Sequence, residues 1–208
     1  MSNNIEKTNT TNEVAVSPII GNTNEVEDES VCSCQCPVCN GFTPIAYINE
    51  WKENFYTLPE NFVFTDFADI FLVEVLGLDI LEMDMEDRQI LLDDIVEDIG
   101  VVGLIFECID AYCDALDVEW SAQILSDDRN EFNILCQLED EYSVPEKFIS
   151  STFPNFIIGF DEGTTLPQKR YHVKKLGEYY VVPLIDNFIV GLCNELEVHV
   201  DTQFEDVF

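Results

Sequence analysis

The chain has 208 residues, of which 42 are Asp or Glu and 9 are Lys or Arg, so its formal net charge is −33. A hydrophobic content of 47% with 15 phenylalanines excludes a purely disordered acidic tail and is enough for a folded core. The charge also excludes electrostatic binding to nucleic acid or to an anionic membrane, because both depend on clusters of basic residues. A basic protein is therefore the expected partner.

Residues 1–31 predict a disordered tail, because they are rich in Asn and Thr and contain few large apolar residues. They lack the basic start and apolar run of a secretory signal. The longest strongly apolar segment, Ile99 to Phe106, is too short to span a bilayer. We expect an intracellular protein, cytoplasmic or nuclear, that is not secreted.

A cysteine cluster follows the tail. Cys36-Pro-Val-Cys39, with Gly41 close behind, resembles one knuckle of a zinc ribbon, in which two thiolates turn back on one ion. Residues 32–42 are thus a possible zinc knuckle, with the ligands Cys32, Cys34, Cys36 and Cys39. Reduced or redox-active thiols are the alternative, because zinc sites usually separate their two cysteine pairs more widely. The other four cysteines, Cys108, Cys113, Cys136 and Cys193, are expected in the core.

The middle of the chain predicts helices. Asp66 to Leu76 is nearly all apolar, and Glu86 to Ile99 repeats apolar residues at spacings of three and four. Gly100 is expected to end that helix. Val101 to Val118 and Asp127 to Tyr142 predict two more helices, the second with Ser126 as its cap.

After Pro145 the pattern changes to short β-branched and aromatic runs separated by turn residues, which predicts an antiparallel β meander. The runs are Phe156 to Phe160, Tyr171 to Leu176, Tyr179 to Ile185, Phe188 to Cys193 and Leu196 to Val200. We find no internal repeat. The expected fold class is α+β, with a single domain over residues 43–208 that is helical over 43–146 and mainly β over 147–208.

Most of the charge lies in the helical middle, where residues 60–146 hold 25 acidic residues against Arg88 and Arg129. An acidic stripe is expected on one face of the helix from Val101, formed by Glu107, Asp110, Asp114 and Asp117. At the rise of an α-helix the stripe is about 15 Å long, with carboxylates about 5 Å apart, close to the spacing of phosphates along a nucleic-acid strand. Asp94 and Asp98 begin a second row.

A solvated face that serves solubility is the alternative interpretation of these acids, and a salt-adapted protein is another. The near-absence of basic residues favours partner binding, because a field of one sign steers a partner of opposite sign, whereas mixed charges serve solubility.

Motifs for catalysis are missing. The sequence has no phosphate-binding glycine loop, no nucleophile elbow and no dinucleotide fingerprint, so we expect no enzymatic activity. His172 and His199 lie in predicted strands without a metal motif. Residues 168–175 form a basic island, predicted as an edge strand protected by lysines, with a dimer contact or an internal dock for acids as alternatives.

The charge pattern resembles that of small viral or mobile-element proteins that imitate nucleic acid. The resemblance is one of charge, and no sequence motif supports it. We therefore predict a non-catalytic inhibitor or regulator that occupies a basic, nucleic-acid-binding surface of a partner protein. A structural or assembly protein of a virion or complex with a basic scaffold is the first alternative. A zinc-dependent regulatory adaptor that uses the cysteine cluster is the second.

Overall fold

A computed structural model describes residues 42–49, 57–126, 131–138, 142–160 and 163–202, which all belong to one compact unit. The predicted disordered tail and the four clustered cysteines lie outside the described residues. The described strands form an antiparallel sheet in the order β2-β3-β1-β4. Their bounds are β1 Phe42–Asn49, β2 Glu119–Ser126, β3 Glu131–Gln137 and β4 His199–Thr202.

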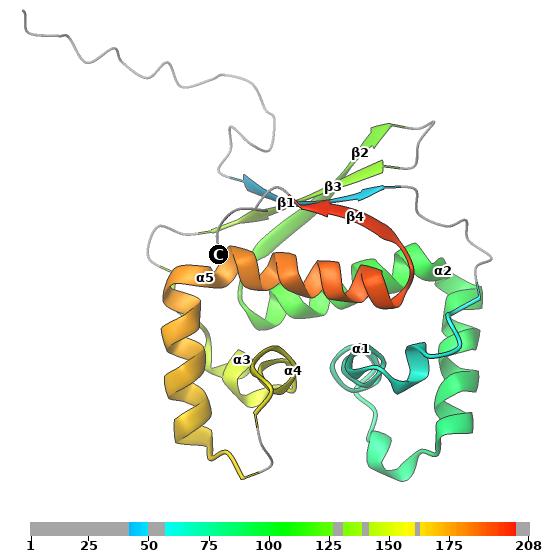
Figure 1. Ribbon diagram of the computed structural model, residues 1–208, viewed down its shortest axis with the longest axis horizontal. Helices are drawn as coiled ribbons and strands as arrows, with labels where there is room; N and C mark the ends of the chain where they lie inside the picture. The colour runs from blue at the N-terminus through cyan, green and yellow to red at the C-terminus, as the bar shows by residue number, and fades with distance from the viewer. Residues whose placement is uncertain (1–41, 50–56, 127–130, 139–141, 161–162, 203–208) are drawn as a thin grey trace, which may run out of the picture. The chain divides into compact units, whose positions relative to one another are not determined.

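The helices cover one side of this sheet (Figure 1). The α-helices are α1 Asp66–Ile70, α2 Met85–Ala115, α3 Glu146–Ser150, α4 Phe153–Ile158 and α5 Leu166–Glu195. Short 3-10 or π helices precede α2, namely η2 Phe62–Phe64, η3 Phe71–Val75 and η4 Ile80–Glu82. Helices packed on an antiparallel sheet confirm the α+β class, and the helices predicted within 66–118 are confirmed with small shifts of their ends.

The predicted C-terminal β meander is wrong. Most of residues 147–195 is helical, and the strand expected at Leu196 to Val200 begins at His199. The β-branched and aromatic residues of this region form the buried side of α5, where they recur at helical spacing. The buried members are Val173, Val181, Ile185, Phe188 and Ile189, and Leu192 lies on the same buried side.

The prediction that residues 43–146 are helical is wrong at β1, β2 and β3. In particular, the helix predicted over Asp127 to Tyr142 is wrong, because β3 occupies its centre. Residues 132–136 are all buried, so both faces of this strand are covered. A strand buried on both faces has no polar alternation, and periodicity does not distinguish it from a buried helix.

The expectation that the chain has no internal repeat is wrong. Pro59-Glu60-Asn61-Phe62 corresponds to Pro145-Glu146-Lys147-Phe148, and Phe67 corresponds to Phe153 at the same distance from each motif. Each motif follows a central strand and precedes short helices, one long helix and an outer strand. We call residues 42–126 the first half and residues 131–202 the second half.

The two long helices end in the same way. Each closes with the paired hydrogen bonds of a Schellman motif, in which a residue of left-handed conformation follows the helix cap. The left-handed residues are Asp117 (φ 52°) and Glu197 (φ 55°). The closing bonds run from Val118 N to Cys113 O at 2.9 Å and from Val198 N to Cys193 O at 2.8 Å. A shared local geometry at both ends supports the repeat.

Both long helices are bent, with one segment under the sheet and one running away from it (Figure 1). In α2 the bend lies at Gly100, whose φ of 75° and ψ of 167° interrupt the helix. In α5, Pro183 lies inside the helix and removes one backbone donor. Gly100 was predicted to end a helix, and the chain turns there and continues as a second helical segment.

The sheet places the halves around an approximate two-fold axis. Tyr47 of β1 lies opposite Asn133 of β3, and these two residues occupy equivalent positions before their motifs. The last strand of each half pairs with the first strand of the other half, β2 with β3 and β4 with β1. The halves therefore exchange strands instead of forming separate sheets.

The aromatic core also joins the halves. Tyr112 of α2 stacks on Phe188 of α5 with ring centroids 4.1 Å apart and planes 7° apart. Phe153 contacts Tyr112 edge-on at 5.0 Å, and Phe67 contacts Phe188 at 5.6 Å. Short-helix phenylalanines thus pack on the long helix of the opposite half, so neither half encloses its own core.

Candidate partner-binding surface

The acidic stripe lies on α2 and at its end. Glu107, Asp110 and Asp114 are exposed on the segment under the sheet, whereas Asp117 follows the helix cap. Asp110 Oδ1 accepts a hydrogen bond from the indole Nε1 of Trp120 at 2.9 Å. The stripe is therefore present, with its last member displaced from the helical face by the Schellman turn.

A lysine from α3 reaches the end of the stripe. Lys147 Nζ lies 2.9 Å from Asp117 Oδ1 and 3.5 Å from Asp114 Oδ2. The hydrogen bond to Asp117, with the nearby charge of Asp114, raises the pKa of Lys147 above its usual value. Helical periodicity does not predict this contact, because Lys147 lies in another helix. Among the described residues, Glu107 and Asp110 are the stripe residues without an ion pair.

The second row lies on the other side of the bend. Asp94 and Asp98 are exposed on the first segment of α2, together with Asp93 and Glu97. Because Gly100 turns the chain, this row does not continue the axis of the stripe. The acidic surface of α2 consists of two segments at an angle, and a single straight stripe does not describe it.

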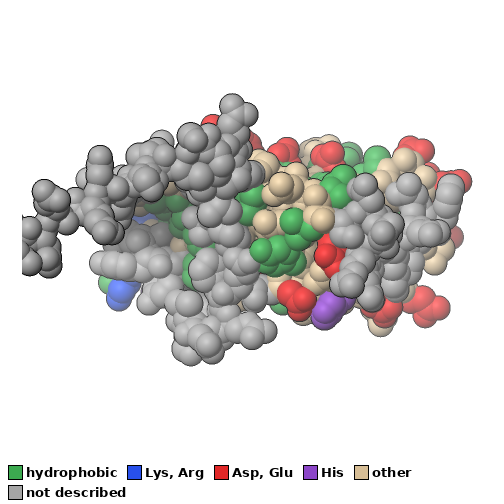
Figure 2. All heavy atoms as spheres, turned by 90° about the horizontal axis from the view of Figure 1, so that it is seen from above, with side chains coloured by type: hydrophobic (Ala, Val, Ile, Leu, Met, Phe, Trp, Pro, Cys, Tyr) green, Lys and Arg blue, Asp and Glu red, His purple; other side chains and the backbone are tan. Residues whose placement is uncertain are grey.

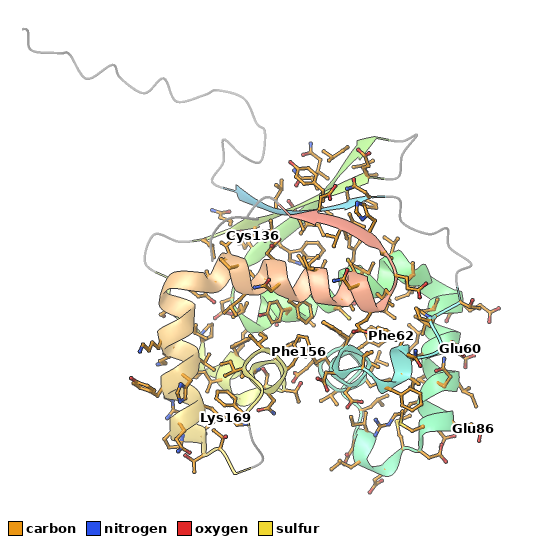
Figure 3. All side chains as sticks on the ribbon, viewed as in Figure 1. Glu60, Phe62, Glu86, Cys136, Phe156 and Lys169 are labelled. Carbon is orange, nitrogen blue, oxygen red and sulfur yellow. The ribbon has the colours of Figure 1, made fainter. Side chains whose placement is uncertain are left out.

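The outer segments of the two long helices carry opposite charge. We call residues 85–99 of α2 the acidic arm and residues 166–175 of α5 the basic arm. Their exposure follows the same order, with Leu92 and Val173 as corresponding buried residues. On this alignment Asp93 and Asp94 correspond to Lys174 and Lys175. Figure 3 shows Glu86 on the acidic arm and Lys169 on the basic arm.

The basic island is helical, so its interpretation as an edge strand is wrong. Arg170 and Lys174 bind the carboxylate of Glu146 on α3, at 3.0 Å from Arg170 Nη2 and 3.2 Å from Lys174 Nζ. The hydrogen bonds from Arg170 and Lys174 lower the pKa of Glu146. The basic island therefore binds one acidic residue of the same chain, which is one of the two alternatives expected for it.

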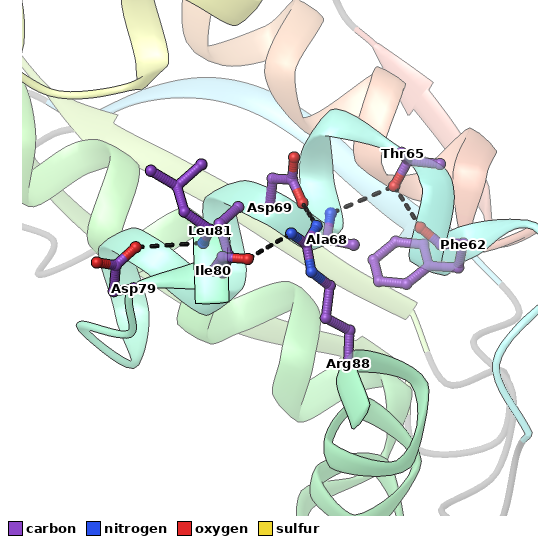
Figure 4. A network of polar contacts seen from close by, with 8 residues as sticks. All are labelled: Phe62, Thr65, Ala68, Asp69, Asp79, Ile80, Leu81 and Arg88. Carbon is purple, nitrogen blue, oxygen red and sulfur yellow. Dashed lines mark hydrogen bonds and ion pairs between the residues drawn. The ribbon is translucent and has the colours of Figure 1, made fainter. Parts of the chain in front are cut away.

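A salt bridge anchors the acidic arm to α1. Arg88 Nη1 donates to Asp69 Oδ1 at 2.9 Å, and Arg88 Nη2 donates to the carbonyl of Ile80 at 2.6 Å (Figure 4). Burial raises the pKa of Asp69, and the charge of Arg88 opposes this shift. In the second half, Lys169 donates to Asn155 from the corresponding positions. These two basic residues brace the arms of their own halves.

A groove opens beside the acidic arm, with a volume of about 700 Å³. Its lining contains three carboxylates, one amide, one hydroxyl and two aliphatic side chains: Thr57, Leu58, Glu60, Gln89, Asp93, Val96 and Glu97. Gln89 Nε2 donates to Asp93 Oδ1 at 2.9 Å. Figure 3 shows Glu60 beside α2. Figure 2 shows acidic side chains spread over the part of that face that is not drawn in grey.

The described cysteines are core residues, as predicted. Cys108, Cys113, Cys136 and Cys193 are free and buried. Burial raises the pKa of Cys136 and of Cys193 to about 12, so both remain protonated thiols at neutral pH. Among the described residues no three His, Cys, Asp or Glu side chains are placed to hold a metal ion. The predicted zinc ligands lie outside these residues and stay a prediction.

Within the described ranges, no helix combines the length and apolarity needed to cross a bilayer. Comparison of the chain with protein-family models, with curated proteins and with solved structures finds no match.

Proposed function

We propose that the protein is a non-catalytic regulator that binds a basic, nucleic-acid-binding surface of a partner protein through the acidic surface of α2. The exposed carboxylates on both sides of the bend carry the proposal. Asp94, Asp98 and Glu107 form no ion pair with another described residue, so their charge is available to a partner.

The proposal depends on a negative electrostatic field around α2 that few basic residues of the described chain neutralise. Lys147 screens one end of the stripe, and Arg88 is committed to Asp69. The remaining charge accelerates the encounter with a basic surface and rejects nucleic acid, which carries the same sign. A partner that normally binds phosphates presents the arginines and lysines that such a surface matches.

A pull-down tests the partner class. Immobilised protein is exposed to a lysate at low salt, and we expect nucleic-acid-binding proteins that are released by high salt. Added duplex DNA should displace them, because a mimic and DNA compete for one surface. Retention of the partner in the presence of excess DNA contradicts mimicry and favours the assembly alternative.

A variant in which three of these carboxylates are neutralised then tests the surface. Asp94→Asn, Asp98→Asn and Glu107→Gln together should lower the affinity for the captured partner about tenfold at low salt, since each exposed ion pair contributes roughly 0.2–1 kcal/mol. The matched control, Glu25→Gln, Glu27→Gln and Asp28→Asn, removes the same charge from the tail. Equal losses from both variants would show that bulk charge, and not the surface of α2, determines binding.

A further inference from the structure

The groove beside the acidic arm differs from its counterpart in the second half. By the alignment of the halves, Glu60 corresponds to Glu146, Gln89 to Arg170 and Asp93 to Lys174. In the second half these positions form a complete ion cluster, in which one carboxylate binds two cations. In the first half the carboxylate is retained and both cations are replaced, by an amide and by a second carboxylate.

We propose that this groove binds the guanidinium or ammonium group of a basic segment from a partner protein. The second half is the occupied counterpart, where Glu146 holds a guanidinium and an ammonium at 3.0 and 3.2 Å. The first half offers the equivalent Glu60 together with Asp93 and Glu97, and a free volume of about 700 Å³ beside them. Among the described residues no base pairs with Glu60, Asp93 or Glu97, and the proposed partner supplies the cation.

The lining favours a side chain over a metal ion. Among the described residues no three His, Cys, Asp or Glu side chains are placed to hold a metal ion. A guanidinium or ammonium group needs fewer carboxylates, as Glu146 shows in the second half. Leu58 and Val96 are apolar parts of the lining that the methylenes of arginine or lysine can cover. Asp93 and Glu97 are one helical turn apart, and a bound cation relieves their mutual repulsion.

This inference rests on the proposed function for the class of partner, and it assigns that partner a defined anchor. A basic residue in the groove fixes the orientation of the complex, whereas the exposed acids of α2 contribute mainly to the rate of encounter.

The test compares two acidic positions. Asp93→Lys fills the groove with the cation that stands at the equivalent place in the second half, where this fold accommodates a lysine. The control, Glu195→Lys, makes the same charge change at an exposed residue of α5, outside the acidic surface of α2. The probe is tetra-arginine peptide, and its affinity for the full chain is measured by calorimetry at low salt.

We expect Asp93→Lys to lower the affinity for the peptide at least about tenfold, and Glu195→Lys to lower it only slightly. The Asp93→Lys protein should melt at the same or a higher temperature, since its lysine pairs with Glu60. Equal losses from the two variants, or no loss from either, would overturn the proposal. If Asp93→Lys fails to fold, Glu60→Gln replaces it, with Glu195→Gln as its control outside α2.

Two further measurements are needed. One distinguishes a polyamine from a protein side chain as the source of the cation, and the other distinguishes the groove from the proposed function. Spermidine that binds as tightly as tetra-arginine, with the same sensitivity to Asp93→Lys, would overturn a protein side chain as the ligand. Loss of the captured partner from the Asp94, Asp98 and Glu107 variant, with full retention by Asp93→Lys, would overturn the groove and leave the proposed function in place.

Discussion

Asp186 is a buried carboxyl group on α5 whose Oδ1 lacks a hydrogen-bond partner in the structure. Burial raises its pKa from 3.8 to about 6, so at neutral pH the folded protein holds a desolvated charge. Asp186→Asn keeps the shape and removes this charge. We expect a gain on the order of 1–2 kcal/mol in the free energy of unfolding above about pH 7.

The sign of the pH dependence follows from the direction of this shift. Between about pH 6 and pH 4 the folded state binds the proton of Asp186 and the unfolded state does not, so acidification stabilises the wild type relative to the variant. The advantage of Asp186→Asn should therefore shrink across this window. Urea unfolding at several pH values measures it, and a constant difference from acid to neutral pH would contradict the role of Asp186.

At the scale of elements, the ends of α2 and α5 offer a matched test of backbone strain. Asp117 and Glu197 have positive φ although neither is glycine. For a residue with a Cβ atom this conformation lowers the free energy of unfolding by about 1–2 kcal/mol. At each position we compare Gly with Ala, because both substitutions remove the same side-chain contacts, including the ion pair of Asp117 with Lys147. At both positions the glycine variant should have a free energy of unfolding about 1 kcal/mol higher than the alanine variant, measured by chemical denaturation. Clearly different values at the two sites would argue against equivalent helix ends.

Elements with one polar face were predictable from the sequence, and elements without one were not. The acidic arm was predicted because its apolar residues recur at helical spacing beside exposed acids. β3 was missed because both of its faces are buried, and α5 because its β-branched and aromatic residues favour strands locally while tertiary packing selects a helix. The repeat was missed because the residues that define it are few, and exposed positions such as Asp93 and Lys174 have opposite charge.

The candidate site was predicted in part for a related reason. Helical periodicity places Glu107, Asp110 and Asp114 on one face, and the structure agrees. The contact of Lys147 with the stripe, the bend at Gly100 and the groove at Glu60 depend on segments that are distant in sequence. Local patterns carry no information on such contacts until the halves are aligned.

At the scale of the molecule, the exchanged strands predict that the two halves hold together without a covalent link. A protease site is inserted between Ser126 and Glu131, and the purified protein is cut there. The fragments should elute together as one native species, because β2 adds to β3, β4 adds to β1 and the Tyr112–Phe188 stack crosses between them. After the cut, unfolding becomes an association equilibrium, so its midpoint in urea should rise with protein concentration, whereas that of the uncut protein should not. Separation of the fragments in native buffer, with loss of helical circular dichroism, would show that the strand exchange and the shared aromatic core are too weak to join the halves.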